Sequence, residues 1–159
     1  MQQIVGIAEM LVSKEVGDEI ITYALGSCLG ITAYDPVAKV GGLLHVMLPL
    51  SSIDPDKASQ RPYMFVDTGL PRLFLESYQR GAQKNRIIVK VAGGANLQHT
   101  QNDQFQIGKR NFIILRKMLW KNGVLLKAQD VGGCSSRTMS LNIASGEVSV
   151  RSNGVSKTL

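Results

Sequence analysis

Two strand-like segments on either side of a turn, residues 28–34 and 40–48, constrain the fold of this chain most. Both are rich in aliphatic, β-branched and aromatic residues, which favour strands. The dipeptide Asp35-Pro36 between them is typical of a type I turn. A further strand is expected just before them, over residues 20–25. These segments predict a β-hairpin, and the length of its loop decides which side chains share a face.

The loop length therefore decides how Cys28 lies relative to His45. With a two-residue loop, Pro36-Val37, Cys28 is directly opposite His45. With a four-residue loop, residues 36–39, Cys28 is opposite Met47 and His45 lies on the diagonal. Either register places both side chains on one face, with Cβ atoms roughly 4.5–8 Å apart. A three-residue loop would place them on opposite faces.

The chemistry of this pair suggests a catalytic role. His45 lies in an otherwise apolar strand, where burial of an imidazole is unfavourable unless its nitrogens find partners. Cys28 follows a Gly-Ser turn, and a neighbouring imidazole is a common means of activating a thiol. The pattern is typical of a cysteine hydrolase or amidohydrolase. The residues alone also allow the interpretation that both side chains merely fill the core.

Length and composition predict one globular domain. The chain has 159 residues, of which 44% are hydrophobic and 19% charged. We expect residues 1–151 to form a single catalytic domain and residues 152–159 a flexible C-terminal tail. The start of the chain lacks the pattern of a signal peptide, so Cys28 and Cys134 are expected to be reduced thiols in the cytoplasm.

The net charge alone does not decide the class of binding partner. The net charge of +6 favours acidic partners, but the basic residues are scattered and do not alternate with aromatic residues as in nucleic-acid-binding surfaces. No nucleic acid is therefore expected. The longest near-apolar run, residues 40–50, is too short to insert across a membrane.

The rest of the chain predicts an α+β fold with about nine strands and two or three helices. One helix is expected from residue 65 or 68 to residue 79; a start at Tyr63 would make Pro71 kink it. A second helix is expected over residues 108–121, and residues 51–61 are expected to form a surface loop. The further expected strands are residues 3–7, 10–12, 19–25, 86–91, 124–130, 138–143 and 147–151.

Glycine pairs and scattered ligand-type residues carry weaker signals. Gly93-Gly94 and Gly132-Gly133 each follow a strand, which is typical of tight turns and of loops that a ligand approaches closely. A zinc site would have to combine Cys28, His45, His99 and Cys134, whose spacing matches no zinc motif. No metal and no other cofactor is predicted.

Five segments together resemble one family. They are Leu25-Gly26-Ser27-Cys28, residues 41–49, residues 91–96, residues 107–111, and Asp130-Val131-Gly132-Gly133. In this order and spacing the chain resembles CheD, the chemoreceptor glutamine deamidase family, over nearly its whole length. The resemblance implies a fold similar to the catalytic domain of the cytotoxic necrotising factor toxins: packed mixed β-sheets with two to three helices on the outside.

The resemblance also implies roles for individual residues. Cys28 would be the nucleophile, His45 the general base and acid, and Thr22 the residue that orients the imidazole. Apart from the resemblance, the mechanism of such an enzyme makes the backbone N–H groups at the Ser27-Cys28 turn, which also contains Gly26, the expected oxyanion donors. A further set is expected to bind substrate or partner: Gly93, Gly94, Asn96 and Arg137. The chain departs from the family pattern at Ala92 and Ser136, and these departures affect the expected contacts with substrate or partner.

The substrates implied by the resemblance are glutamine side chains on the cytoplasmic helices of chemotaxis receptors. Two alternatives remain open. The chain could act mainly as a binding regulator of a CheC-like chemotaxis phosphatase, or the same thiol could hydrolyse receptor methyl esters. An intact set of Thr22, Cys28 and His45 favours catalysis over a purely structural role.

Overall fold

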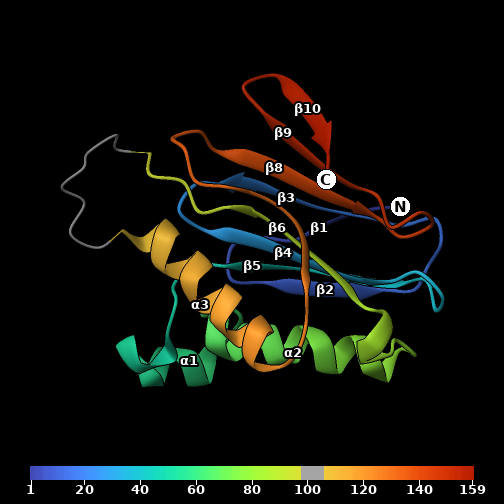
Figure 1. The fold of residues 1–159 in the computed structure, drawn as a ribbon, viewed down its shortest axis with the longest axis horizontal. Helices are drawn as coiled ribbons and strands as arrows, with labels where there is room; N and C mark the ends of the chain where they lie inside the picture. The colour runs from blue at the N-terminus through green and yellow to red at the C-terminus, as the bar shows by residue number, and fades with distance from the viewer. Residues whose placement is uncertain (98–105) are drawn as a thin grey trace.

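The computed structural model describes residues 1–97 and 106–159 and has three layers (Figure 1). Two mixed five-stranded β-sheets stack face to face, and the α-helices lie together against the outer face of one of them. This arrangement confirms the expected α+β class, with packed mixed sheets and three α-helices.

The first sheet has the strand order β1-β3-β8-β9-β10. Its strands pair antiparallel except for β1 and β3, which are parallel. The bounds are β1 Gln2–Ile4, β3 Glu19–Leu25, β8 Arg137–Asn142, β9 Val148–Ser152 and β10 Val155–Thr158. The strand β3 is interrupted by a register shift between Thr22 and Leu25, which changes the direction of the chain as it leaves the sheet.

The second sheet has the strand order β2-β5-β4-β6-β7 and lies between the first sheet and the helices. Only β6 and β7 are parallel to each other. The bounds are β2 Met10–Ser13, β4 Leu29–Asp35, β5 Val40–Val46, β6 Ile88–Gly93 and β7 Leu126–Val131. Because β4 and β5 are central, almost every side chain of the predicted hairpin is buried.

The helix layer contains α1 (Pro55–Gln60), α2 (Val66–Gln79) and α3 (Ile107–Lys121). Short 3-10 turns at Ser51–Ile53, Pro62–Met64 and Lys84–Arg86 connect the strands and helices around them. The helices α2 and α3 contact each other and the outer face of the second sheet. None of the helices in the described ranges is long and apolar enough to span a membrane.

Two separate apolar cores hold the layers together. The core between the second sheet and the helices is built from side chains such as Ile31, Leu44, Leu73 and Leu115. The core between the two sheets contains Leu25, Leu43, Met139 and Leu141 among others. The second sheet is thus covered on both faces, which explains why His45 on β5 has no contact with solvent.

The hairpin follows the four-residue-loop alternative. Asp35 pairs with Val40, and Gly30 pairs with His45. Extending this register by one pair beyond β4 places Cys28 opposite Met47, with His45 on the diagonal of the same face. The same-face prediction is confirmed by this register, and the directly opposed alternative is wrong.

Two local expectations are wrong. Residues 51–61 form the helix α1 rather than a loop, because Asp54 caps the helix by accepting a hydrogen bond from the Lys57 N–H and Pro55 occupies its first position. Residues 155–158, expected within a flexible tail, form β10 and pair antiparallel with β9. The helix α2 begins at Val66, next to the expected start at residue 65, and contains Pro71.

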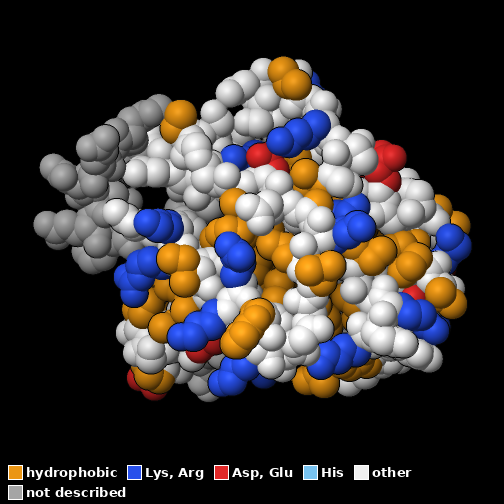
Figure 2. Space-filling view, in the orientation of Figure 1, with side chains coloured by type: hydrophobic (Ala, Val, Ile, Leu, Met, Phe, Trp, Pro, Cys, Tyr) orange, Lys and Arg blue, Asp and Glu red, His pale blue; other side chains and the backbone are white. Residues whose placement is uncertain are grey.

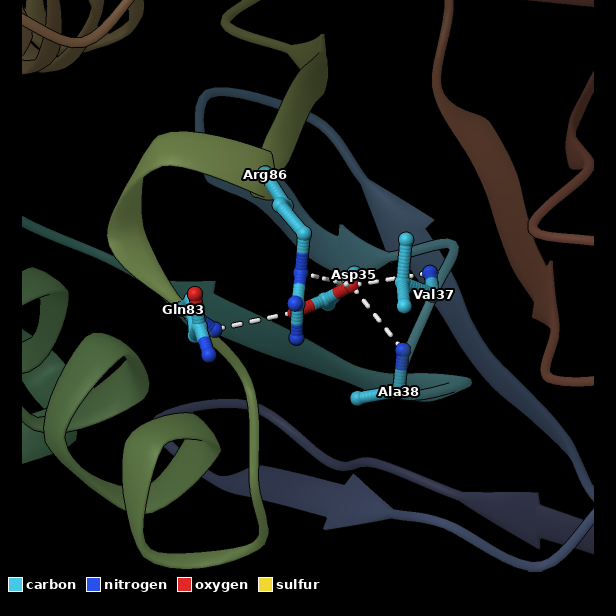
Figure 3. Close-up of polar contacts among 5 residues, drawn as sticks. All are labelled: Asp35, Val37, Ala38, Gln83 and Arg86. Atoms are coloured by element: carbon cyan, nitrogen blue, oxygen red, sulfur yellow. Dashed lines mark hydrogen bonds and ion pairs between the residues drawn. The ribbon is translucent and has the colours of Figure 1, made fainter.

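The hairpin turn is fixed by Asp35, whose carboxylate is fully buried (Figure 3). It accepts hydrogen bonds from the backbone N–H groups of Val37, Ala38 and Gln83 and from the Arg86 guanidinium, at 2.9–3.1 Å. Burial alone raises the pKa of Asp35, but the Arg86 contact and the backbone donors outweigh burial and lower the pKa to about 2. One carboxylate therefore anchors the hairpin to the segment that precedes β6.

We expect Asp35→Asn to lower the free energy of unfolding at neutral pH by about 2 kcal/mol. The folded-state pKa lies below the ordinary value of 3.8, so this contribution is present above about pH 4 and is lost as the pH falls towards 2. Urea unfolding across this range measures it, with Asp56→Asn on the exposed start of α1 as control. A difference between wild type and Asp35→Asn that does not shrink at low pH would contradict the assignment.

Candidate active site

The connection between β3 and β4 carries Cys28 and has a strained entry. After the register shift in β3, Ala24 adopts a left-handed conformation with φ of 58°, which is rare for a residue with a Cβ. The Gly26 N–H then donates to the Ala24 carbonyl, which tightens the turn. Ser27 and Cys28 are half-buried, whereas Gly26 and Leu29 on either side are buried. The turn therefore brings Cys28 to the rim of the inter-sheet core.

Gly93, the last residue of β6, and Gly94 directly after it hold this turn from behind. The Gly94 N–H donates to the Cys28 carbonyl at 2.8 Å, and the Ala95 N–H donates to the Gly26 carbonyl at 2.8 Å. Gly93 has a φ of 112°, and a Cβ at this position would collide with the Cys28 carbonyl oxygen. Only glycine satisfies both conditions, so the pair fixes the backbone of Cys28.

Arg137 supports the same contact from the first sheet. Its guanidinium is buried and donates to the Gly93 carbonyl at 3.2 Å, and it lies 3.5 Å from the Asp130 carboxylate. The structure thus places Gly93, Gly94 and Arg137 together beside Cys28, as a support for its backbone. Substrate or partner binding by these residues stays a prediction.

His45 lies on β5, fully buried, and reaches Thr22 on β3 across the space between the two sheets. The Thr22 Oγ1 atom is 2.7 Å from His45 Nδ1 and 2.7 Å from the Val5 carbonyl oxygen. A carbonyl can only accept, so the single hydroxyl proton of Thr22 goes to Val5. His45 Nδ1 must then donate to Thr22, which leaves the lone pair on Nε2.

The geometry leaves His45 Nε2 available. This atom is buried and has no hydrogen-bond partner among the described residues, so the Cys28 thiol does not bond to it in this structure. Cys28 lies one strand away on the diagonal of the same face. Thr22 and His45 are therefore in contact as predicted, whereas the thiol and the imidazole are neighbours without a bond. Such bonds often tighten only when substrate is present.

Burial determines the protonation of both groups. It lowers the pKa of His45 from 6.5 to about 4, and the charge of Glu9 opposes this only weakly. Burial also raises the pKa of the Cys28 thiol, while the backbone N–H of Cys28 itself acts in the opposite direction. Both shifts disfavour a thiolate–imidazolium pair. At neutral pH the resting site therefore holds a neutral thiol and a neutral imidazole.

Asn96 and Cys134 lie on connections other than the turn that carries Cys28. Asn96 donates its N–H to the Gly133 carbonyl and lines a cavity of about 360 Å³ together with Gly94, Lys109 and Gly132. Neither Cys28 nor His45 is among the residues that line this cavity. Cys134 is exposed on the connection between β7 and β8. His99 lies outside the described residues, and within them no three His, Cys, Asp or Glu side chains could hold a metal ion.

Two contributors were missed by sequence reasoning. The Val5 carbonyl carries no signature in the sequence, because any residue offers a carbonyl. Asn111 on α3 did leave a signal: it falls on the inward stripe of the helix, where Leu115 and Leu119 also lie. A polar residue on an apolar stripe needs buried partners, and Asn111 donates to the carbonyls of Ser27 and Met47.

Comparisons with known proteins identify the family of this chain. The chain matches the family described as CheD chemotactic sensory transduction over residues 47–152. A Syntrophus aciditrophicus protein, named probable chemoreceptor glutamine deamidase CheD 1, is 53% identical over 151 residues, which cover 95% of this chain and 94% of that protein. This chain belongs to the CheD family.

Two further CheD relatives show how widely the likeness extends. The proteins from Solibacter usitatus and Thermococcus kodakarensis, both named probable chemoreceptor glutamine deamidase CheD, are 49% and 40% identical to this chain. The alignments cover 99% and 97% of this chain and 93% and 96% of the respective relatives. The CheD family match itself begins at residue 47, after Thr22, Cys28 and His45. The case for these three residues therefore depends on their geometry.

We expect the His45 ring to stay neutral down to about pH 4, with its proton on Nδ1. Nitrogen-15 NMR of the imidazole measures both the midpoint and the tautomer. Thr22→Val removes the acceptor of the Nδ1 proton and should abolish the tautomer preference, whereas Thr22→Ser keeps the hydroxyl and should preserve it. A midpoint near 6.5, or a proton on Nε2 in the wild type, would contradict this geometry.

Proposed function

We propose that this protein is a cytoplasmic chemoreceptor glutamine deamidase, an amidohydrolase that uses Cys28 as nucleophile, His45 as general base and acid, and Thr22 to orient His45. The observation that carries the proposal is the buried imidazole beside the turn of Cys28, whose Nδ1 is fixed by Thr22 and whose Nε2 has no partner among the described residues. The names of the relatives supply the substrate class, chemoreceptor glutamines.

Acylation of the enzyme begins from the neutral pair. His45 Nε2 takes the thiol proton as Cys28 Sγ attacks the side-chain amide carbon of glutamine, which gives a tetrahedral oxyanion. The backbone N–H groups of the turn at Ser27 and Cys28 are the donors closest in sequence to the nucleophile. The imidazolium then gives its proton to the amide nitrogen, the C–N bond breaks, ammonia leaves and a glutamyl thioester remains.

Hydrolysis of the thioester reverses the roles. His45 Nε2 takes a proton from water, the hydroxide attacks the thioester carbon, and the C–S bond breaks. The imidazolium returns its proton to the Cys28 sulfur, and glutamate is released. The same acyl intermediate would form from a receptor methyl ester, so methyl-ester hydrolysis is distinguished only by the leaving group.

The surface around α3 suits an acidic protein substrate. Lys109, Arg110, Arg116, Lys117 and Lys121 are exposed along this helix, which contains no acidic residue. Figure 2 shows this side of the molecule, where Lys and Arg side chains are spread widely and Asp and Glu side chains are few. Such a surface raises the rate of encounter with an acidic partner.

The test is peptide mass spectrometry of a purified receptor cytoplasmic fragment incubated with the protein. We expect conversion of specific glutamines to glutamate by the wild type, and none by Cys28→Ala or His45→Ala. A methylated fragment in the same assay reports ester hydrolysis through loss of methanol. Absence of any glutamine conversion would contradict the proposal, and retained binding of a CheC-like phosphatase by Cys28→Ala would then favour the regulator.

The value of kcat/KM should rise with pH through about 4 and stay high at neutral pH, because His45 acts as a base only when neutral. An ordinary histidine would place this rise near 6.5. Initial rates between pH 3.5 and 8, with folding monitored by circular dichroism, measure the midpoint. A midpoint between 6 and 7 would show that His45 is not buried as described.

Salt should lower kcat/KM while kcat stays constant, because screening weakens the attraction between exposed cations and the substrate. We expect Lys117→Gln combined with Lys121→Gln to lower kcat/KM several-fold and to flatten the salt dependence. Lys14→Gln, at an exposed position between β2 and β3, is the matched control and should leave both unchanged. Equal effects of the α3 pair and Lys14 would exclude α3 as the docking face.

A further inference from the structure

Asn111 is fully buried on α3, and its side-chain amide bridges two segments of the candidate active site. Its Nδ2 group donates to the Ser27 carbonyl at 3.1 Å and to the Met47 carbonyl at 3.0 Å. Ser27 directly precedes Cys28, and Met47 lies two residues beyond His45. One amide group thus uses both of its protons to join the nucleophile turn to the end of β5.

The hydrogen bond to Ser27 has a consequence for Cys28. The Ser27 carbonyl and the Cys28 N–H belong to one planar trans peptide, in which the two groups point in opposite directions. Fixing the carbonyl towards Asn111 therefore fixes the Cys28 N–H away from α3. Because this N–H belongs to the nucleophile itself, it is the donor that we assign to the oxyanion formed when Cys28 attacks a carbonyl.

The frame around Asn111 is rigid enough to hold this geometry. Gly108, one turn earlier on α3, packs so tightly against Gly94 that a Cβ at position 108 would lie 2.5 Å from the Gly94 carbonyl carbon. Gly94 in turn donates to the Cys28 carbonyl. The start of α3 is therefore seated on the same turn that Asn111 contacts, and the position of the amide is fixed at both ends.

The amide is oriented by its acceptors. Both partners are carbonyls, which only accept, so the Asn111 NH₂ group must face them. The Asn111 Oδ1 atom is buried and has no hydrogen-bond partner among residues 1–97 and 106–159. In the described structure, this side chain therefore makes two hydrogen bonds, both as a donor. The orientation that allows them leaves its oxygen without a partner.

We propose that Asn111 is a positioning residue that aims the Cys28 N–H at the oxyanion and sets the distance between Cys28 and His45. The inference builds on the proposed deamidase function and adds a residue outside the Cys-His-Thr set. Asn111 does not touch the reacting atoms: it acts through the Ser27–Cys28 peptide and through the end of β5.

The test compares two reactions of the same thiol in Asn111→Ala and Asn111→Leu, the second of which keeps the number and branching of the side-chain heavy atoms. Asn122→Ala is the matched control, because Asn122 also donates through Nδ2, to Met118 at the far end of α3. Deamidation develops an oxyanion and depends on the Cys28 N–H. Alkylation of Cys28 by iodoacetamide, followed by peptide mass spectrometry to separate it from Cys134, displaces iodide and develops none.

We expect both Asn111 variants to lower kcat by about 10²-fold, with KM nearly unchanged and the Cys28 alkylation rate lowered far less than kcat. Asn122→Ala should change none of these values. A kcat equal to that of the wild type, or an alkylation rate that falls in parallel with kcat, would overturn the inference, because the latter indicates general disruption of the turn.

A readout without turnover separates this inference from the proposed function. The Cys28 amide resonance in the proton–nitrogen NMR spectrum should move in Asn111→Ala and stay in place in Asn122→Ala. An unmoved resonance would overturn the inference whatever the activity. If the wild type converts no glutamine but the resonance moves in Asn111→Ala, the proposed deamidase function is contradicted. The positioning of the Ser27–Cys28 peptide by Asn111 is then still supported.

Discussion

The hydrogen bond between Thr22 and His45 is the interaction on which the candidate site depends, because it connects the two sheets. Thr22 belongs to the first sheet and His45 to the second, and both side chains are fully buried at the rim of the inter-sheet core. The bond can form only if the sheets pack at the observed separation. Close packing of Leu43, Met139 and Leu141 in that core therefore also determines the tautomer of the imidazole.

A site built inside an apolar core has electrostatic consequences. The same burial that fixes His45 removes water from both of its faces, so the imidazole is a weak base that stays neutral at physiological pH. The thiol is likewise held in its neutral form. In the proposed mechanism, the proton is therefore transferred during attack, and the backbone around Cys28 stabilises the developing charge.

Hydrophobic periodicity and the residues of the turn were sufficient to predict the central hairpin. The Asp35-Pro36 turn and the alternation along β4 and β5 predicted a shared face for Cys28 and His45, and one of the two registers left open is the one observed. The helix α1 was missed although Asp54 and Pro55 carry a clear start signal, because a short polar helix resembles a loop in composition. The pairing of β10 with β9 depends on a tight turn at Asn153, whose φ is 53°.

What the sequence could not supply are contacts between distant segments. The Val5 carbonyl, the support of Gly93 by Arg137 and the bridge made by Asn111 each join residues separated by 15 or more positions. Such contacts depend on how the layers of the fold pack against one another. Hydrophobic periodicity predicts only the face of a helix or strand on which a residue lies. The lack of a hydrogen bond between Cys28 and His45 could not be predicted either. Strand register determines which residues are neighbours, but it does not determine their side-chain rotamers.

The helix α3 has two functional faces within a single element. Its outer face carries exposed cations and the exposed Trp120, while its inner face carries Asn111 and packs at Gly108 against the loop behind Cys28. One helix therefore spans the distance between the cationic surface and the backbone around Cys28. A substitution on α3 can accordingly affect the surface, the turn of Cys28 or both, depending only on which face of the helix carries it.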